Sequence, residues 1–125
     1  MSRIRSKDTL PELVVRRTVH GMGFRFRLHR RNLPGRPDLV FPGKRKAILV
    51  HGCFWHSHRC RRGLVHPKTN AEYWFAKRRA IVDRDKTDLA KLKALGWEVM
   101  VVWECWITDE RRLRGRLGAF LGGAE

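Results

Sequence analysis

The feature that most limits how this chain can fold is a dense group of potential metal ligands at residues 51–60. Two cysteines and three histidines fall within this segment, directly after an apolar run, and Cys105 follows a second apolar run. Thiolate and imidazole are the ligands that tetrahedral zinc prefers. The sequence therefore predicts a closed, structural Cys3His zinc site formed by Cys53, His58, Cys60 and Cys105. The spacing differs from the common CxxC knuckle, so a reduced, partly buried cysteine cluster remains the alternative.

Charge indicates the class of partner. The 125 residues include 28 lysines and arginines against 12 aspartates and glutamates, a formal net charge of +16. This imbalance favours a polyanion, and nucleic acid is the first candidate; a merely soluble basic surface rarely needs so large an excess. No apolar stretch approaches the roughly 20 residues of a membrane span, and the basic start leads into no signal-peptide core. We therefore expect an intracellular protein whose odd number of cysteines serves ligation or remains as thiols.

Apolar spacing and turn signals predict a single α/β domain spanning residues 1–125, in the order helix, three strands, helix, strand, helix. The second and third strands form a hairpin through Pro42-Gly43. The strands are expected at 24–28, 39–41, 47–50 and 99–103. Because the strand at 47–50 is apolar throughout, we place it in the middle of the sheet, and the strand at 99–103 is a second fully apolar run.

The helices carry recognisable boundary signals. They are expected at 9–21, at 70–95 and from 108 onward. Thr9 can cap the first helix with Glu12 as its capping-box partner, and a break near Asp83 is left open in the second. Thr108 can cap the last helix. Its apolar residues fall on one face: Leu113, Leu117, Phe120 and Leu121.

A turn delivers Asp38 to the first position of the strand at 39–41. Gly35 permits a tight turn, and Pro37 should keep Arg36 extended. Aspartate is common at strand starts, so Asp38 can be an ordinary turn residue. Alternatively, its carboxylate is a ligand for Mg2+, which could activate water against a phosphodiester. Spacing alone leaves both interpretations open.

Several motifs in the same order resemble the very-short-patch repair endonucleases, with a match from about Thr9 to Cys105. The motifs are Pro34-Gly35-Arg36-Pro37-Asp38, His51-Gly52-Cys53-Phe54-Trp55-His56, Tyr73-Trp74, Asp83-Arg84-Asp85, Leu95-Gly96-Trp97 and Val102-Trp103-Glu104-Cys105. The resemblance implies a PD-(D/E)xK-type nuclease fold with a central mixed sheet flanked by helices, and a structural zinc to which His58 is a ligand. It further implies Mg2+-dependent nicking of double-stranded DNA at T:G mismatches left by deamination of 5-methylcytosine.

The resemblance also implies roles for single residues. Asp38 is similar to the family's metal-binding aspartate, with the main-chain carbonyl of Val50 as the second magnesium ligand. The usual second carboxylate and lysine of PD-(D/E)xK enzymes are missing, since Val50 and Gly52 stand at their places. Imidazoles would replace them. His56 resembles the general base, which suits a side chain that titrates near neutral pH, and His51 would lie near the scissile phosphate.

Two acidic residues complete the implied catalytic group. Asp85 would orient His56, although it could equally be a solvated helix charge beside Arg84 or Lys86. Glu12 resembles a glutamate whose carboxylate reaches the outer shell of the metal, although the capping box explains it without any chemistry.

Aromatic and basic residues predict the DNA contacts. Trp97 and Trp103 flank an apolar strand and are assigned to the core. The resemblance implies that Phe54, Trp55 and Trp74 are wedges between bases, where a mismatched step costs less to open. The basic residues near them would hold phosphates and specify no sequence, or form a solvated face: Arg59, Arg61, Arg62, Lys68, Lys77, Arg78 and Arg79.

Departures from the family pattern affect specificity. Ser57 replaces a histidine, Ile81 replaces a polar residue that faces DNA, and the arm before Thr9 is short. We expect a monomeric, zinc-stabilised endonuclease in the prokaryotic cytoplasm, associated with the nucleoid, for which other mismatch-repair proteins are candidate partners. Two alternatives stay open: a related endonuclease without mismatch selectivity, and a catalytically silent, zinc-stapled DNA-binding module.

Overall fold

The computed structural model describes residues 9–28, 32–53, 60 and 68–122, and these ranges confirm the expected order of elements. The helices and strands are α1 (Leu10–Gly21), β1 (Arg27–Leu28), β2 (Leu39–Phe41), β3 (Lys46–His51), α2 (Ala71–Ala94), β4 (Glu98–Trp103), the short 3-10 helix η1 (Glu104–Thr108) and α3 (Glu110–Leu121). No helix in the described part of the chain is both long and apolar enough to cross a membrane.

The four strands form one mixed sheet in the order β1-β2-β3-β4. The first three are antiparallel neighbours, whereas β3 and β4 run parallel. A parallel pair needs a long crossover, and α2 provides it. The register pairs Val50 with Val102 and His51 with Trp103, so the parallel strands β3 and β4 end at the same level of the sheet. Residues that follow the two strands are therefore brought side by side.

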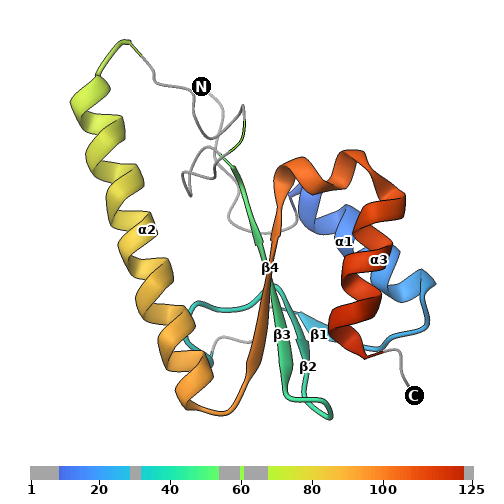
Figure 1. Ribbon diagram of the computed structural model, residues 1–125. Coiled ribbons are helices and arrows are strands. Elements are labelled where there is room, and N and C mark those ends of the chain that lie inside the picture. Colours follow the sequence, from blue (N-terminus) through green and yellow to red (C-terminus); the bar gives the residue numbers. More distant parts are fainter. Residues whose placement is uncertain (1–8, 29–31, 54–59, 61–67, 123–125) are drawn as a thin grey trace.

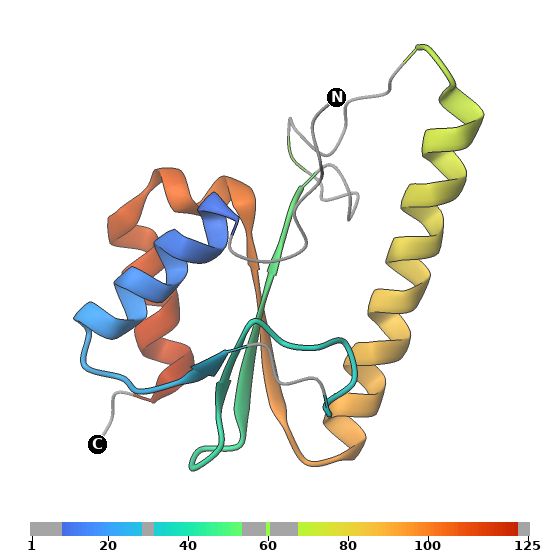
Figure 2. The same cartoon turned by 180° about the vertical axis from the view of Figure 1, so that it is seen from behind.

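Helices cover both faces of the sheet, with α1 and α3 on one face and α2 on the other (Figures 1 and 2). Strand β2 and most of β3 and β4 are apolar because alternate residues enter different cores. Leu39, Ile48 and Val102 pack toward α1 and α3, whereas their neighbours Val40 and Ala47 belong to the core on the α2 face. The sheet is thus buried on both sides.

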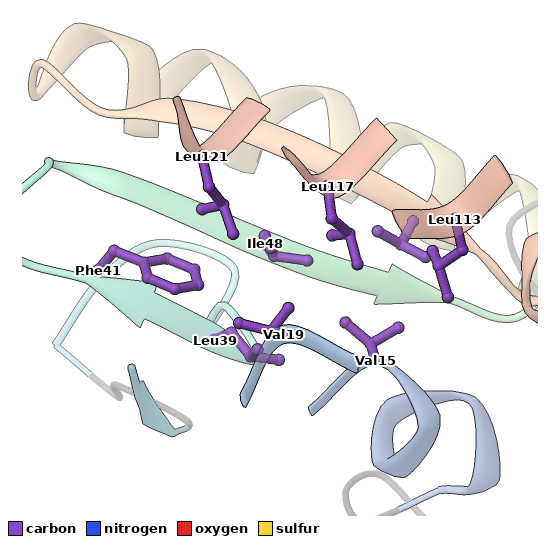
Figure 3. Packing of buried hydrophobic residues seen from close by; sticks show 9 residues of the cluster. Val15, Val19, Leu39, Phe41, Ile48, Leu113, Leu117 and Leu121 are labelled. Atoms are coloured by element: carbon purple, nitrogen blue, oxygen red, sulfur yellow. The ribbon is translucent and has the colours of Figure 1, made fainter. Parts of the chain in front are cut away.

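The larger core lies between the sheet and the pair α1 and α3. Figure 3 shows Leu117 and Leu121 of α3 pointing toward the strand that carries Ile48, and Leu113 lying above Val15 of α1, with Val19 nearby. All of these side chains are fully buried. The three leucines recur every four residues, the spacing of one helix face, and this confirms the expected apolar face of the last helix.

A smaller core joins α2 to the opposite face. Leu92 of α2 is fully buried there, and Leu89 packs against the same cluster. Trp97 is 7% exposed and belongs to this cluster, as expected. The Arg45 guanidinium lies 5.1 Å from the Trp97 ring centre and donates a hydrogen bond to the Leu95 carbonyl. The hairpin turn is thereby fastened to the chain between α2 and β4.

The structure corrects two expectations about the elements and decides the one that was left open at Asp83. The strand expected at 24–28 is reduced to Arg27–Leu28, and α2 continues through Asp83 without a break. Thr108 does not cap α3; it ends η1, and Asp109 is the cap, its carboxylate accepting a hydrogen bond from the Arg112 N–H. Thr9 caps α1 as expected, because its hydroxyl accepts from the Glu12 N–H.

Candidate active site and metal centre

Asp38 is fixed at the start of β2 by two hydrogen bonds to β3. Its N–H donates to the Ile48 carbonyl at 3.0 Å, and its carboxylate Oδ2 accepts from the Val50 N–H at 2.7 Å. The side chain is half-buried. Because N–H and C=O of one strand residue point toward the same neighbour, the Val50 carbonyl faces the edge on which Asp38 lies. The structure thus brings together the two residues that were expected to hold magnesium.

The turn before Asp38 is tight, but one prediction about it is wrong. The Arg36 N–H donates to the Leu33 carbonyl at 3.1 Å, and Gly35 has a φ of 76°. Arg36 is not extended: its φ is 45°, in the left-handed region. Pro37 disfavours the right-handed helical conformation for Arg36 but does not choose between the remaining regions. The turn also packs closely on α2, since a Cβ at Gly35 would lie 3.1 Å from the Asp88 Cβ.

His51, at the end of β3, is held between two neighbours. It is 6% exposed, and its Nδ1 lies 3.9 Å from Oδ2 of Asp85, a half-buried residue of α2. Its ring packs edge to face on the Trp103 ring, with 5.3 Å between centres. Trp103 is only half-buried, so this residue, assigned to the core by sequence, also lines the site. Asp85 therefore lies near His51, while His56, which it was expected to orient, lies outside the described residues.

Glu12 is buried in α1 and forms an ion pair with Arg16, one helical turn later. The Glu12 carboxylate is 2% exposed, which is unusual for a glutamate unless it is paired. The ion pair gives Glu12 a structural role in α1. Its expected action in the outer shell of the metal stays a prediction.

Cys53, Cys60 and Cys105 form a compact cluster beyond the ends of β3 and β4. Their sulfur atoms all lie within 4.8 Å of one another, and none of the three forms a disulfide. Cys53 is fully buried, and its Sγ accepts a hydrogen bond from the Cys105 N–H at 3.4 Å. The Cys53 N–H donates to the Glu104 carboxylate at 3.2 Å. Three of the four expected zinc ligands are thus gathered, while His58 lies outside the described residues.

The chemistry of this cluster fits a soft, tetrahedral metal ion. Burial is the main cause that raises the pKa of the Cys53 thiol to about 12, and hydrogen bonds with Cys60 and Cys105 raise it further. The N–H of Cys105 acts in the opposite direction. Sulfurs bound to one zinc lie about 3.8 Å apart, so separations of no more than 4.8 Å need to contract by about 1 Å at most. A dication would also replace the thiol protons and remove the cost of charging buried sulfur.

The first turns of α2 carry aromatic and basic side chains. Trp74 is half-buried and packs edge to face on Tyr73, a residue that is 56% exposed. Lys77 lies 5.8 Å above the Tyr73 ring. Lys68, Lys77 and Arg79 are exposed, whereas Arg78 is only 7% exposed. Exposed cations beside an aromatic pair suit a nucleic-acid contact, and burial makes Arg78 the least accessible of the described basic candidates.

The remaining predicted residues cannot be placed. They lie outside the described residues: Phe54, Trp55, His56, His58, Arg59, Arg61 and Arg62.

Sequence reasoning missed two residues beside the site, Trp103 and Glu104. Both belong to the same short motif as Cys105, but their contacts depend on the parallel pairing of β3 with β4. An apolar run signals a strand without giving its register. Only the equal distance of Cys53 and Cys105 from their strand ends could have suggested the alignment.

One family profile and several known proteins match this chain. A family profile described as DNA mismatch endonuclease Vsr matches residues 1–62. Type II nicking enzyme V.XorIIP of Xanthomonas oryzae pv. oryzae is 50% identical over 117 residues, 94% of this chain and 85% of the relative. Type II nicking enzyme V.NmeAIP of Neisseria meningitidis is 37% identical over 117 residues, with coverages of 94% and 83%. DNA mismatch endonuclease Vsr of Escherichia coli is 41% identical over 113 residues, with coverages of 90% and 72%.

Proposed function

The chain belongs to the Vsr family and is a DNA nicking endonuclease, and from this premise we propose that it cuts one strand of duplex DNA at or near T:G mismatches by Mg2+-dependent hydrolysis. Membership in a family of nicking enzymes sets aside the catalytically silent binding module. The observation that carries the proposal is the hydrogen bond between Asp38 and Val50, the residue before His51, whose ring lies near Asp85. The carboxylate, the main-chain carbonyl and the imidazole thus come from the end of β3 and from the residue before β2.

Asp38 and Val50 would hold the magnesium ion. A carboxylate and a main-chain carbonyl are hard oxygen donors, which Mg2+ prefers, and a site with so few protein ligands leaves room for water. Bound there, the ion would activate water and stabilise charge on the phosphate. The Val50 N–H holds the Asp38 carboxylate in one orientation through the 2.7 Å hydrogen bond. Val50 and Gly52 stand where PD-(D/E)xK enzymes carry a carboxylate and a lysine, and the mixed sheet is compatible with that fold.

Imidazole groups would take the place of the missing carboxylate and lysine. His51 lies at the end of β3, its Nδ1 3.9 Å from Oδ2 of Asp85, and would lie near the scissile phosphate. We assign proton abstraction from the attacking water to His56, on the resemblance alone. Trp74, Lys68, Lys77 and Arg79 of the described residues are exposed or half-exposed and would contact the DNA.

A second candidate function is nicking without mismatch selectivity. The relative at 50% identity and the one from Neisseria meningitidis are named nicking enzymes, and neither name mentions a mismatch. The names therefore favour this second candidate, whereas the family profile and the Escherichia coli relative are named for mismatches. Ser57 and Ile81 are the positions at which selectivity could differ.

One assay separates the two candidates. End-labelled duplexes would carry T:G or C:G at a single position within a pool of flanking sequences, incubated with Mg2+ or with a chelator. Preferential nicking of T:G duplexes that stops with chelator supports the first proposal. Equal nicking of both duplexes supports the second candidate, and nicking that continues in chelator contradicts the proposed role of Mg2+.

The setting of the protein is part of the proposal. A monomer in the bacterial cytoplasm, acting at the nucleoid together with other mismatch-repair proteins, is consistent with relatives from bacteria. We also propose that residues 1–125 form one endonuclease domain with a structural zinc ion at Cys53, His58, Cys60 and Cys105.

A further inference from the structure

Glu104, the first residue of η1, links the two strand ends that carry Cys53 and Cys105. The pairing of His51 with Trp103 aligns the ends of β3 and β4. Each cysteine follows its strand end by two residues, so the aligned ends bring the two cysteines together. The Glu104 carboxylate accepts a hydrogen bond from the Cys53 N–H at 3.2 Å, and the Cys105 N–H donates to the Cys53 sulfur at 3.4 Å. The two hydrogen bonds join the segment after β3 to the first turn of η1, one with its donor in each segment.

We infer that Glu104 is a positioning residue for the metal centre, which holds the Cys53 backbone so that the three thiols are arranged before an ion binds. The inference rests on the zinc site proposed above. Glu104 itself is not placed on the metal. Among the described residues, the side chains that could share one ion at this position are Cys53, Cys60 and Cys105.

Electrostatics alone gives no reason for a carboxylate beside three thiols. A negative charge near thiolates is unfavourable, and burial already makes the Cys53 thiolate costly. The hydrogen bond supplies the reason. Cys53 is fully buried, and buried backbone N–H groups are almost always paired. Glu104 provides a partner for the Cys53 N–H from the neighbouring strand end, so part of the cost of ordering this ligand is met during folding.

The experiment measures zinc affinity, independent of nicking. Purified protein is stripped of metal, reloaded with Zn2+ and titrated against a chromogenic chelator. Glu104→Ala should bind zinc about 10–100-fold more weakly, the usual effect of losing a group that orients a metal ligand. Glu104→Gln keeps an oxygen acceptor and should stay within a few-fold of the parent. Glu110→Ala is the matched control, because it removes an exposed carboxylate from the first turn of α3 and should leave affinity unchanged.

A second variant covers a failure to fold. If Glu104→Ala shows no native circular dichroism, Glu104→Met removes the acceptor while keeping the length of the side chain, and the same loss of affinity is expected. Unchanged affinity in the folded variants would overturn the inference.

Cobalt substitution tests the alternative that Glu104 is itself a ligand. The visible bands of bound Co2+ should keep their positions in Glu104→Ala and Glu104→Met, because the ligand set is unchanged. Shifted bands would make Glu104 a ligand and overturn the positioning role. A parent protein that binds no zinc would overturn both the inference and the proposed zinc site, while the nicking assay would still stand or fall separately.

Discussion

Replacing Asp38 should separate the stability that its carboxylate provides from the chemistry proposed for it. The 2.7 Å hydrogen bond from the Val50 N–H ends on a charged acceptor. Such bonds contribute about 1.5–3 kcal/mol. Because Asp38 is only half-buried, we expect Asp38→Ala to lower the free energy of unfolding by about 2 kcal/mol. For a domain of this size, that corresponds to a fall in Tm of roughly 8 °C.

Asp38→Asn should behave differently in the two assays. Its amide oxygen can still accept from the Val50 N–H, so the free energy of unfolding should stay within about 1 kcal/mol of the parent. A neutral amide is a poor partner for Mg2+, so nicking should fall by roughly 100-fold or more, which is about 3 kcal/mol of activation free energy. Asp38→Ala should lose both stability and nicking.

The measurements are thermal unfolding in magnesium-free buffer and single-turnover nicking of an end-labelled duplex with Mg2+. Asp83→Asn serves as the control, because Asp83 is an exposed carboxylate on α2. Near-normal nicking by Asp38→Asn would place the metal elsewhere. Full stability of Asp38→Ala would show that the hydrogen bond to Val50 contributes nothing to folding.

Three further perturbations follow from the fold and the site. Leu117→Ala empties a fully buried position between α3 and the sheet (Figure 3) and should cost about 2–5 kcal/mol in denaturant unfolding; a loss below about 1 kcal/mol would mean that the larger core is misplaced. Trp74→Ala should shrink the preference for T:G over C:G duplexes by about 1–3 kcal/mol in competition binding. Lys77→Ala should instead flatten the salt slope by about 1, and an unchanged preference in Trp74→Ala would argue against the wedge. In metal-free protein the pKa of Cys53 is raised from 9.0 to about 12, so the folded state keeps a proton that the unfolded state releases. The stability from this group should be present below about pH 9 and be lost as the pH rises toward 12. Alkaline unfolding in chelator tests this, and a flat profile across that window would contradict it.

The order of elements could be predicted because each one carries its own local signal. The capping hydroxyl of Thr9, the leucines spaced by four in α3 and the uninterrupted apolar run of β3 all describe short stretches of chain. The three cysteines could be grouped because cysteines outside a disulfide framework are expected to bind a metal ion or to form a reduced, partly buried cluster. Each of these inferences was confirmed to the extent that the described residues cover it.

What the sequence left undetermined depends on contacts between distant segments. Nothing near Arg36 indicates a φ of 45°, because proline restricts the preceding residue without selecting the left-handed region. Thr108 and Asp109 are both good caps, and only the short η1 turn decides between them. The approach of His51 to Asp85 and Trp103 depends on strand register and on the path of α2. Local propensity cannot report either of these.

The continuity of α2 also bears on the distance between the proposed DNA contact at Trp74 and the proposed site of cleavage at Asp38. The helix is anchored on the sheet near its end, at Leu89 and Leu92, and displays Trp74 near its start. Leu92 follows Trp74 by 18 positions, a separation of about 27 Å at the usual helical rise. Because the helix is unbroken, adding or removing one turn would move Trp74 by about 5.4 Å relative to Asp38. Spacing along the DNA between recognition and cleavage could therefore be changed in relatives by helix length alone, with no substitution among the residues that touch the phosphate.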